Sequence, residues 1–396
     1  MKRASAGLLP ACACTLLAVA TAAGGDPGTL PTAASLEPPQ GTLGEIADPW
    51  TGGAVRLVGA PYARYSPETA WAFGAGSFLW FHADPVARAT GRASSVGASV
   101  QYTLRRQSSA SAVWDLYLSE GRLRTGGAFC DERWPSELWG PGLASGAPGE
   151  PYLPRTVKAE VGLAARIVDA EEGRGLWLGL QARGRTDAFD GLEPGGLLDR
   201  CAVAGCRGGR VLSLAVTAAW DTRDDVFSPG RGLLLSARAG PAVASPGGPG
   251  GGSGTFLDGD LDARAWLPLP LPRGARLALQ VRLQVASGNV PFYVLPTFGG
   301  DHSLRGVLEG RWRDRTALSF QAEYVTPLFW RLGVGLFGGA GQVAPRPAAL
   351  GLERFVPAGG AGLRLTVDRA DRVILRLDRG VSRGLANWYL SIGEAI

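Results

Sequence analysis

Segments that alternate between apolar and polar residues recur along this chain and limit what it can fold into. In Leu277–Val285 every second residue is Leu or Val, and Gln280, Arg282 and Gln284 stand between them. Side chains alternate between the two faces of a strand, so this segment has one apolar and one polar face. The same alternation occurs in Val157–Leu163, Leu261–Ala265 and Leu363–Asp368. A membrane barrel needs such strands, because one face meets lipid and the other meets a water-filled interior.

The N-terminus has the pattern of an export signal. Lys2 and Arg3 precede an apolar stretch, and Ala20-Thr21-Ala22 fits the small-x-small cleavage rule. We therefore expect residues 1–22 to be a signal peptide that is cleaved after Ala22 or Ala23. Cys12 ends a segment that resembles a lipoprotein processing site, but the apolar run before it is too short for that alternative.

The remaining chain has no segment with the ~18 uncharged apolar residues that a transmembrane helix requires. An exported membrane protein without such helices has one common solution, a closed β-barrel. Composition agrees, because 59 Gly and 28 Pro residues punctuate many short strands. The net charge of +5 does not indicate nucleic-acid binding, since the Arg residues are dispersed among Asp and Glu rather than clustered.

Turn signals divide residues 54–396 into strands of about ten residues. The predicted strands are Thr69–His82, Ser95–Leu104, Ala112–Ser119, Arg122–Asp131, Thr156–Val168, Leu176–Arg185, Arg210–Thr222, Gly232–Ala242, Phe256–Pro268, Arg276–Ser287, Thr316–Thr326, Leu332–Val343, Gly360–Asp368, Arg372–Val381 and Ala386–Ile396. Their number is odd, whereas bacterial single-chain barrels have an even number of strands. One strand is therefore missing, and the candidates for it are Val55–Tyr62 and Phe292–Gly299.

We predict an all-β fold, a transmembrane antiparallel β-barrel of ~16 strands over residues 54–396. Residues 23–53 are rich in Pro, Gly and Thr and are expected to be a disordered periplasmic extension. The alternative is a soluble, exported β-sandwich. A sandwich strand rarely places several charges near the centre of one face, as Asp258, Asp260 and Asp262 do here. A sandwich of this length would also usually be divided into more than one domain.

The chain contains five Cys, of which Cys12 and Cys14 leave with the signal peptide. Cys201 and Cys206 lie in one Gly-rich loop, and in an oxidising envelope they are expected to form a small loop disulfide. A metal site is not expected there, because it would need more ligands and no His is near. Cys130 remains and is expected to be inert.

The segment from Asp221 to Gly232 ends one predicted strand and begins the next. Pro229 presets φ, Gly232 permits unusual dihedrals, and the side chains of Asp221 and Asp224 can accept hydrogen bonds from nearby amides. Together with Arg223, these residues resemble the D-x-R-D…P-x-x-G turn of the bacterial surface antigen family, the outer-membrane barrels related to BamA and TamA. The resemblance implies a turn on the periplasmic side.

Four further segments resemble this family in the order in which its motifs occur. They are Tyr65–Thr69, Gly299–Val307, Gln321–Pro327 and Trp388–Ala395. The likeness spans essentially the whole mature chain. In the family, an extracellular loop folds back into the barrel, and its Arg reaches acidic residues on the inner wall. The resemblance assigns these roles to Arg305 and Glu323.

The local pattern agrees with this assignment. Apolar residues occupy alternate positions around Glu323, which places its carboxylate on the luminal face. Gly299, Gly300 and Gly306 would let the loop backbone pass close to the wall. An Arg–carboxylate pair in a partly dehydrated lumen would fix the loop geometry more than it adds net stability. The alternative is an ordinary extracellular loop in which Arg305 is solvated.

Three features depart from the family. Gly339 stands where a second acidic partner would fall, so we expect Arg305 to have one partner. The last residue is Ile396 rather than the aromatic residue that typically closes such barrels. Larger relatives carry periplasmic POTRA domains that hold client polypeptides. Residues 24–53 are too few to form one, so we expect a short member without POTRA domains.

The sequence offers little for catalysis. A Ser–His hydrolase would have to use His82 or His302, the only His residues, and no nucleophile elbow is present. The Gly-rich segment 247–254 lacks the Gly-Lys-Ser/Thr ending of a phosphate loop. Asp258 and Asp260 are expected to be solvated luminal charges. We expect no catalytic residue, no cofactor and no metal site.

The resemblance implies protein insertion, translocation or lipid handling at the outer membrane of a Gram-negative-type cell. We expect an assembly or transport accessory that contacts outer-membrane lipid, works with a periplasmic or membrane partner protein and does not bind nucleic acid. One alternative is a passive channel or structural surface barrel that is plugged by the loop around Arg305. A less favoured alternative is a barrel hydrolase.

Overall fold

A computed structural model describes residues 45–47, 54–66, 70–81, 94–143, 149–170, 174–224, 229–248, 253–368, 373–392 and 394–396. The predicted signal peptide, most of the predicted extension, Pro67–Thr69 and His82 lie outside these residues.

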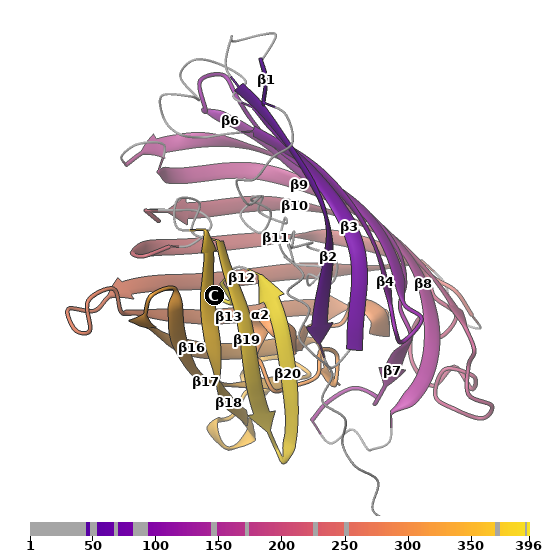
Figure 1. Ribbon diagram of the computed structural model, residues 1–396. Helices are drawn as coiled ribbons and strands as arrows, with labels where there is room; N and C mark the ends of the chain where they lie inside the picture. The colour runs from indigo at the N-terminus through magenta and orange to yellow at the C-terminus, as the bar shows by residue number, and fades with distance from the viewer. Residues whose placement is uncertain are drawn as a thin grey trace, which may run out of the picture.

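The described chain is almost entirely β-structure (Figure 1). Its largest sheet has 18 strands, and two of them, β1 (Glu45–Ala47) and β7 (Ser136–Leu138), are short strands that each pair with one neighbour only. The other sixteen follow one another in an antiparallel ring. They are β2 (Ala54–Ser66), β3 (Ala70–Phe81), β4 (Ser94–Thr103), β5 (Ser108–Leu118), β6 (Leu123–Arg133), β8 (Glu150–Asp169), β9 (Gly175–Asp190), β10 (Gly209–Asp221), β11 (Gly232–Pro246), β12 (Gly254–Pro268), β13 (Arg276–Gly288), β16 (Thr316–Phe329), β17 (Leu332–Ala344), β18 (Val356–Asp368), β19 (Val373–Ser382) and β20 (Leu385–Ile392).

The predicted antiparallel barrel of about 16 strands is confirmed. The strand missing from the prediction is β2, which pairs with β3 along its whole length. Phe292–Gly299 is not a barrel strand. It forms the 3-10 turn η2 (Phe292–Val294) and the two-residue strand β14 (Thr297–Phe298). β2 and β20 meet at one residue pair, Tyr65 and Leu390.

One stretch of the predicted extension is ordered. β1 lies within residues 23–53, which we expected to be disordered, and it pairs with the first residues of β2. A strand as short as β1 carries no alternation that the sequence could reveal, and its position is set by pairing to β2.

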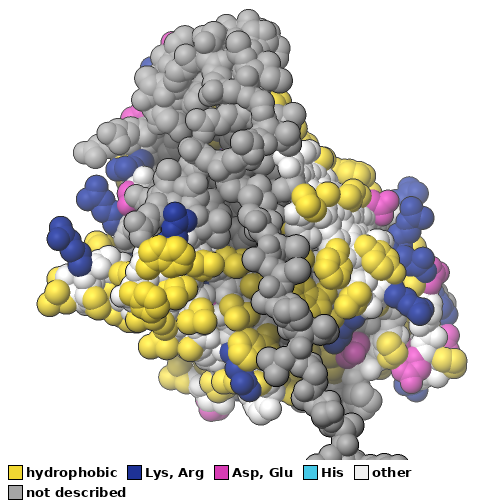
Figure 2. Space-filling view, in the orientation of Figure 1, with side chains coloured by type: hydrophobic (Ala, Val, Ile, Leu, Met, Phe, Trp, Pro, Cys, Tyr) yellow, Lys and Arg dark blue, Asp and Glu magenta, His cyan; other side chains and the backbone are white. Residues whose placement is uncertain are grey.

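The two faces of each strand follow the alternation in the sequence. On β12, Asp260 and Asp262 point into the barrel and are buried, whereas Leu257 and Leu261 point outward and are 61% and 39% exposed. Figure 2 shows hydrophobic side chains over the outer face of the barrel that is turned toward the viewer. Such a large exposed apolar surface suits contact with lipid. Among the described residues, no helix is both long and apolar enough to cross a membrane.

The two ends of the barrel differ in their connections. Short turns join β5 to β6 at residues 119–122 and β16 to β17 at residues 330–331. At the other end, residues 191–208 and 289–315 form long loops. Outer-membrane barrels have short periplasmic turns and longer extracellular loops, so the long loops mark the extracellular end.

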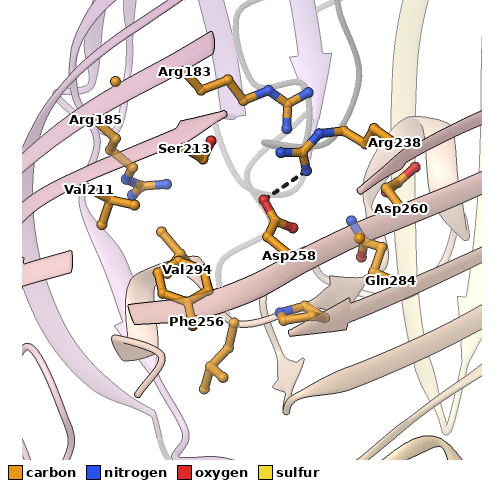
Figure 3. A pocket seen from close by; sticks show the side chains of 14 residues that line it. Arg183, Arg185, Val211, Ser213, Arg238, Phe256, Asp258, Asp260, Gln284 and Val294 are labelled. Carbon is orange, nitrogen blue, oxygen red and sulfur yellow. Dashed lines mark hydrogen bonds and ion pairs between the residues drawn. The ribbon is translucent and has the colours of Figure 1, made fainter. Parts of the chain in front are cut away.

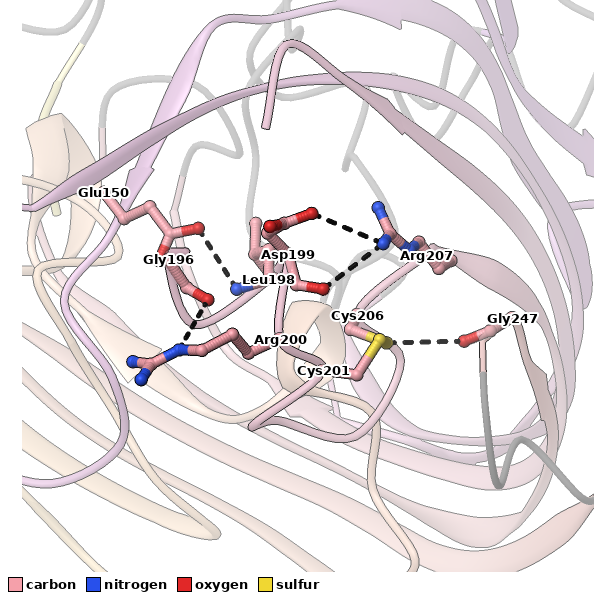
Figure 4. Close-up of a disulfide and its surroundings, with 9 residues drawn as sticks. All are labelled: Glu150, Gly196, Leu198, Asp199, Arg200, Cys201, Cys206, Arg207 and Gly247. Carbon is pink, nitrogen blue, oxygen red and sulfur yellow. Dashed lines mark hydrogen bonds and ion pairs between the residues drawn. A yellow bond between two sulfur atoms is a disulfide. The ribbon is translucent and has the colours of Figure 1, made fainter. Parts of the chain in front are cut away.

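The loop of residues 191–208 folds over the extracellular end. The sulfurs of Cys201 and Cys206 are bonded within it (Figure 4). Cys206 belongs to a buried cluster that also contains Tyr152 and Phe292, so the loop packs on β8 and η2. The carboxylate of Glu150 accepts a 3.1 Å hydrogen bond from the backbone N of Leu198. The remaining thiol of the described residues, Cys130, is half-buried and not bonded to another Cys.

Candidate functional site: a buried charge cluster beneath an inward loop

The long loop of residues 289–315 turns into the barrel instead of standing above it. β14 pairs with β15 (Trp312–Arg313), and between them lies one helical turn, α2 (Gly300–Ser303). Phe298 stacks on Trp312 with ring centroids 5.7 Å apart. Both rings are buried against the luminal residues Val343 of β17 and Val356 of β18. An apolar underside therefore seats the loop on the inner wall.

Glycines bring the loop backbone against the wall. Three loop glycines have positive φ values, in a region that residues with a side chain rarely adopt. The values are +119° at Gly299, +79° at Gly300 and +104° at Gly306. A Cβ on Gly306 would lie 2.9 Å from the backbone N of Val381 in β19. A Cβ on Gly380 would lie 2.6 Å from the backbone N of Gly306. Neither side of this contact has room for a side chain.

This close approach carries Arg305 into a fully buried position. Its Nη2 donates to Oε2 of Glu323 at 2.6 Å, and its Nη1 donates to Oδ2 of Asp378 at 2.5 Å. The guanidinium also stacks on Phe337, 3.7 Å from the ring centroid. The structure thus brings the predicted pair Arg305 and Glu323 together.

The expectation of a single acidic partner is wrong. The second carboxylate is Asp378 of β19, not a residue at position 339 of β17. Gly339 could not carry a side chain here, because its Cβ would lie 2.2 Å from the backbone O of Phe320. Strand β19 lies two places further along the ring, and Arg305 still reaches it because the loop crosses over β19 at Gly380.

Two further Arg extend the pair into a network. Arg364 of β18 pairs with Glu323 and with Asp378. Arg376 of β19 donates to Asp378 at 3.1 Å and to Asp301 of α2 at 2.8 Å. The charge cluster is therefore Asp301, Arg305, Glu323, Arg364, Arg376 and Asp378. It holds three cations and three anions, and this balance is what makes burial of so many charges tolerable.

The last strand, β20, also holds the loop. The backbone N of Gly306 donates to the hydroxyl of Tyr389 at 3.0 Å, and Asn387 donates to the backbone O of Gly306 at 3.0 Å. Ser391 donates to Asp301 at 2.5 Å. Burial raises the pKa of Asp301, but Arg376 and His302 outweigh this and hold the pKa below its usual value. Asp301 therefore stays charged, and the loop is tied to β16, β18, β19 and β20.

Sequence reasoning missed seven polar members of this site. They are Asp301, Arg364, Arg376, Asp378, Asn387, Tyr389 and Ser391. For two of them a signal existed, because Leu375 and Leu377 alternate with Arg376 and Asp378 as in a barrel strand. The alternation shows which residues face the lumen, but not which of them the loop reaches.

The predicted turn motif lies at the periplasmic end, away from the charge cluster. Arg223 Nη2 pairs with Asp221 at 2.8 Å, and its guanidinium lies over Trp266 at 5.8 Å. Asp224 Oδ1 accepts hydrogen bonds from the backbone N of Gly230 and Arg231, at 2.9 and 3.1 Å.

Pro229 and Gly232 complete the predicted set. Pro229 is buried. Gly232 has a φ of +121°, and a Cβ there would lie 2.5 Å from the backbone O of Thr222. The motif is therefore a compact turn whose five predicted residues lie together.

The chain end meets this turn. β20 stops at Ile392, before the predicted end of the strand at Ile396. Ile396 is buried with Trp266 and Ala278 inside the periplasmic end of the barrel. Glu394 pairs with Arg276 of β13. We expected Ile396 to end the last barrel strand in place of the usual aromatic residue. Instead it lies beyond the strand, and its side chain is buried inside the barrel.

The inward loop, β16, β18 and the first part of β19 fall within one recognised domain, whereas β20 lies beyond it. Residues 204–378 match the Omp85 superfamily domain. The chain carries an Omp85 superfamily domain. The resemblance to BamA and TamA-like barrels that the motifs indicated is thereby confirmed. The matched residues include all six residues of the charge cluster and the whole turn motif. No curated protein sequence matches the chain.

Solved structures of Omp85 barrels have the same architecture. BamA from Haemophilus ducreyi lacking POTRA domains 1–3 superposes with a TM-score of 0.55 at 13% identity, over 85% of this chain and 70% of that one. CdiB from Acinetobacter baumannii gives 0.56 at 14% identity, over 86% and 59%. CdiB from Escherichia coli gives 0.53 at 12% identity, over 86% and 62%. This chain therefore has their barrel fold and spans about three-fifths of the CdiB chains.

Proposed function

We propose that this outer-membrane barrel is an assembly or transport accessory that works with a periplasmic or membrane partner protein. The Omp85 domain supports an assembly or translocation type of barrel. Every described element belongs to the barrel, its loops or the short strands paired to it, so the proposal leaves client docking to the partner.

The observation that carries the proposal is the buried, charge-balanced anchor of the inward loop. Arg305 is fully buried, and it joins the loop to Glu323 of β16 and Asp378 of β19. Breaking a buried ion pair costs about 3–5 kcal/mol, since it leaves an uncompensated charge. A loop held this firmly occupies the lumen at rest, which suits a barrel that opens only with a partner and not a permanently open pore.

Conductance across a planar bilayer tests this proposal. We expect negligible current from the wild-type barrel, together with envelope-assembly defects when the gene is deleted. The matched control for the variant Arg305→Ala is Arg313→Ala in the same loop. In the contacts described, Arg313 donates only to the backbone oxygens of Gly310 and Phe292. Its current should equal that of the wild type.

The charge cluster also supports a second candidate, a passive channel plugged by the loop. In that case the wild-type barrel conducts weakly and steadily. Arg305→Ala then raises the current severalfold, and deletion leaves envelope assembly intact. The two candidates therefore differ in the deletion phenotype as well as in the current.

We propose no enzymatic role. His302, the one His among the described residues, is an exposed loop residue whose backbone O accepts a hydrogen bond from Gln321. Hydrolysis of lipid esters by the purified barrel, lost on His302→Ala, would contradict this. The proposed signal cleavage after Ala22 or Ala23 is tested by N-terminal sequencing of the mature protein.

A further inference from the structure

A cavity lies in the lumen on the side formed by β9 to β13, away from the charge cluster (Figure 3). Its lining consists of luminal side chains from these strands and the start of the inward loop at Val294–Pro296. The polar lining residues that matter here are Arg183, Ser213, Arg238, Asp258, Asp260 and Gln284. Nothing in the proposed function uses this cavity.

Arg238 of β11 lines the cavity, is 7% exposed and has one donor group without a partner. Its Nε donates to Gln181 at 3.1 Å, and its Nη1 donates to Asp258 at 2.7 Å. Its Nη2 is buried and has no hydrogen-bond partner. A buried donor without a partner is unfavourable, and a guanidinium fork suits the oxygens of a carboxylate or a phosphate.

Arg183 of β9 brings a second guanidinium to the same place. Figure 3 shows its terminal nitrogens directed toward those of Arg238. Arg183 pairs with Glu160 through Nε at 3.1 Å, so its charge is partly balanced on the side away from Arg238. Two guanidinium groups that face each other repel, and a negative group between them would relieve the repulsion.

The remaining lining leaves room for a small ligand. Ser213 stands opposite Arg183 in the strand register and offers a hydroxyl, while Gly184 adds no side chain. The two acids of the lining already have Arg partners, Asp258 with Arg238 and Asp260 with Arg282. Asp260 is balanced by Arg282, and Asp258 occupies only Nη1 of Arg238, which leaves Nη2 for a ligand.

We propose that this cavity binds a small free oxyanion, a phosphate or a carboxylate, between Arg183 and Arg238. The ligand accepts hydrogen bonds from Nη2 of Arg238 and from the hydroxyl of Ser213. It is free in the lumen and is not a lipid headgroup, because the cavity is lined by luminal side chains and not by the lipid-facing row.

Calorimetric titration of the purified barrel in phospholipid-free non-ionic detergent tests the proposal, with inorganic phosphate as the probe and chloride at equal ionic strength as the reference. We expect saturable phosphate binding, weakened about tenfold or more in Arg238→Gln, because a charge-assisted hydrogen bond is lost. The matched control is Arg264→Gln. Arg264 is another luminal Arg, paired with Asp262, and is not among the residues lining the cavity. Its affinity should be unchanged.

Diffraction from wild-type crystals soaked in selenate gives a second readout that does not depend on any variant folding. An anomalous peak between Arg183 and Arg238 supports the site. The proposal is overturned if phosphate binds no better than chloride, if both variants lose affinity equally, or if selenate is found only elsewhere. Displacement of bound phosphate by added phospholipid would assign the site to a headgroup and would also overturn it.

Discussion

At the scale of single residues, the carboxylate of Glu323 is the main anchor of the inward loop on the barrel wall. It is 2% exposed and pairs with both Arg305 and Arg364. Glu323→Gln keeps the shape but removes one negative charge, so the charge cluster changes from neutral to a net positive charge. The expected cost is about 3–5 kcal/mol in loop anchoring. Limited proteolysis should then cut residues 300–310 faster.

The control for this prediction is Glu353→Gln. Glu353 is an acid near the extracellular end with a 79% exposed side chain and only a 3.9 Å contact to Arg354. Exposed pairs of this kind contribute little, so its cleavage pattern should match the wild type. Equal cleavage rates in Glu323→Gln and the wild type would show that Arg305 does not hold the loop.

Residue identity alone could predict only part of this site. Arg305 and Glu323 were expected from resemblance and from the alternation around Glu323. Asp378 was not, because its role depends on where Gly306 lies over β19, a contact between residues far apart in sequence. Local patterns show which face a residue occupies, and long-range packing decides its partner.

At the scale of elements, the inward loop depends on backbone contact with β19. Gly306→Ala adds a Cβ 2.9 Å from the backbone of Val381, at a φ of +104°. The loop cannot keep its position in this variant. We expect a fall of several degrees in the temperature at which the barrel changes its mobility on SDS gels. The control, Gly338→Ala, adds a Cβ on an exposed position of β17 with its nearest neighbour 3.8 Å away, and should leave the transition unchanged. Equal transitions for both variants would contradict this contact.

The strands themselves were largely predictable, since alternation is a local signal. β2 was the difficult strand, because Gly59 and Pro61 interrupt its pattern. Phe292–Gly299 was wrongly considered as a barrel strand because its composition is typical of one. Its apolar residues look like strand residues, but they cover the extracellular end by packing Phe292 on Tyr152 and Phe189.

At the scale of the whole molecule, the exposed Leu and Val rows require a lipid-like environment. We expect the mature protein to need detergent for extraction, to give β-type circular dichroism, and to migrate differently on SDS gels before and after boiling. Free solubility without detergent, or identical mobility in both samples, would contradict the barrel. The conductance of the barrel and the envelope-assembly phenotype of the deletion then test whether the lumen is closed and what the barrel does.

The seclusion of the charge cluster has an environmental consequence. Dissolved salt weakens electrostatic attraction only where ions can approach the charges, and Arg305, Arg376 and Asp378 are shut away from solvent. The ion pairs among these residues should therefore be as strong at high salt concentration as at low salt concentration. The inward loop should therefore keep its position against the barrel wall over a wide range of external salt concentrations.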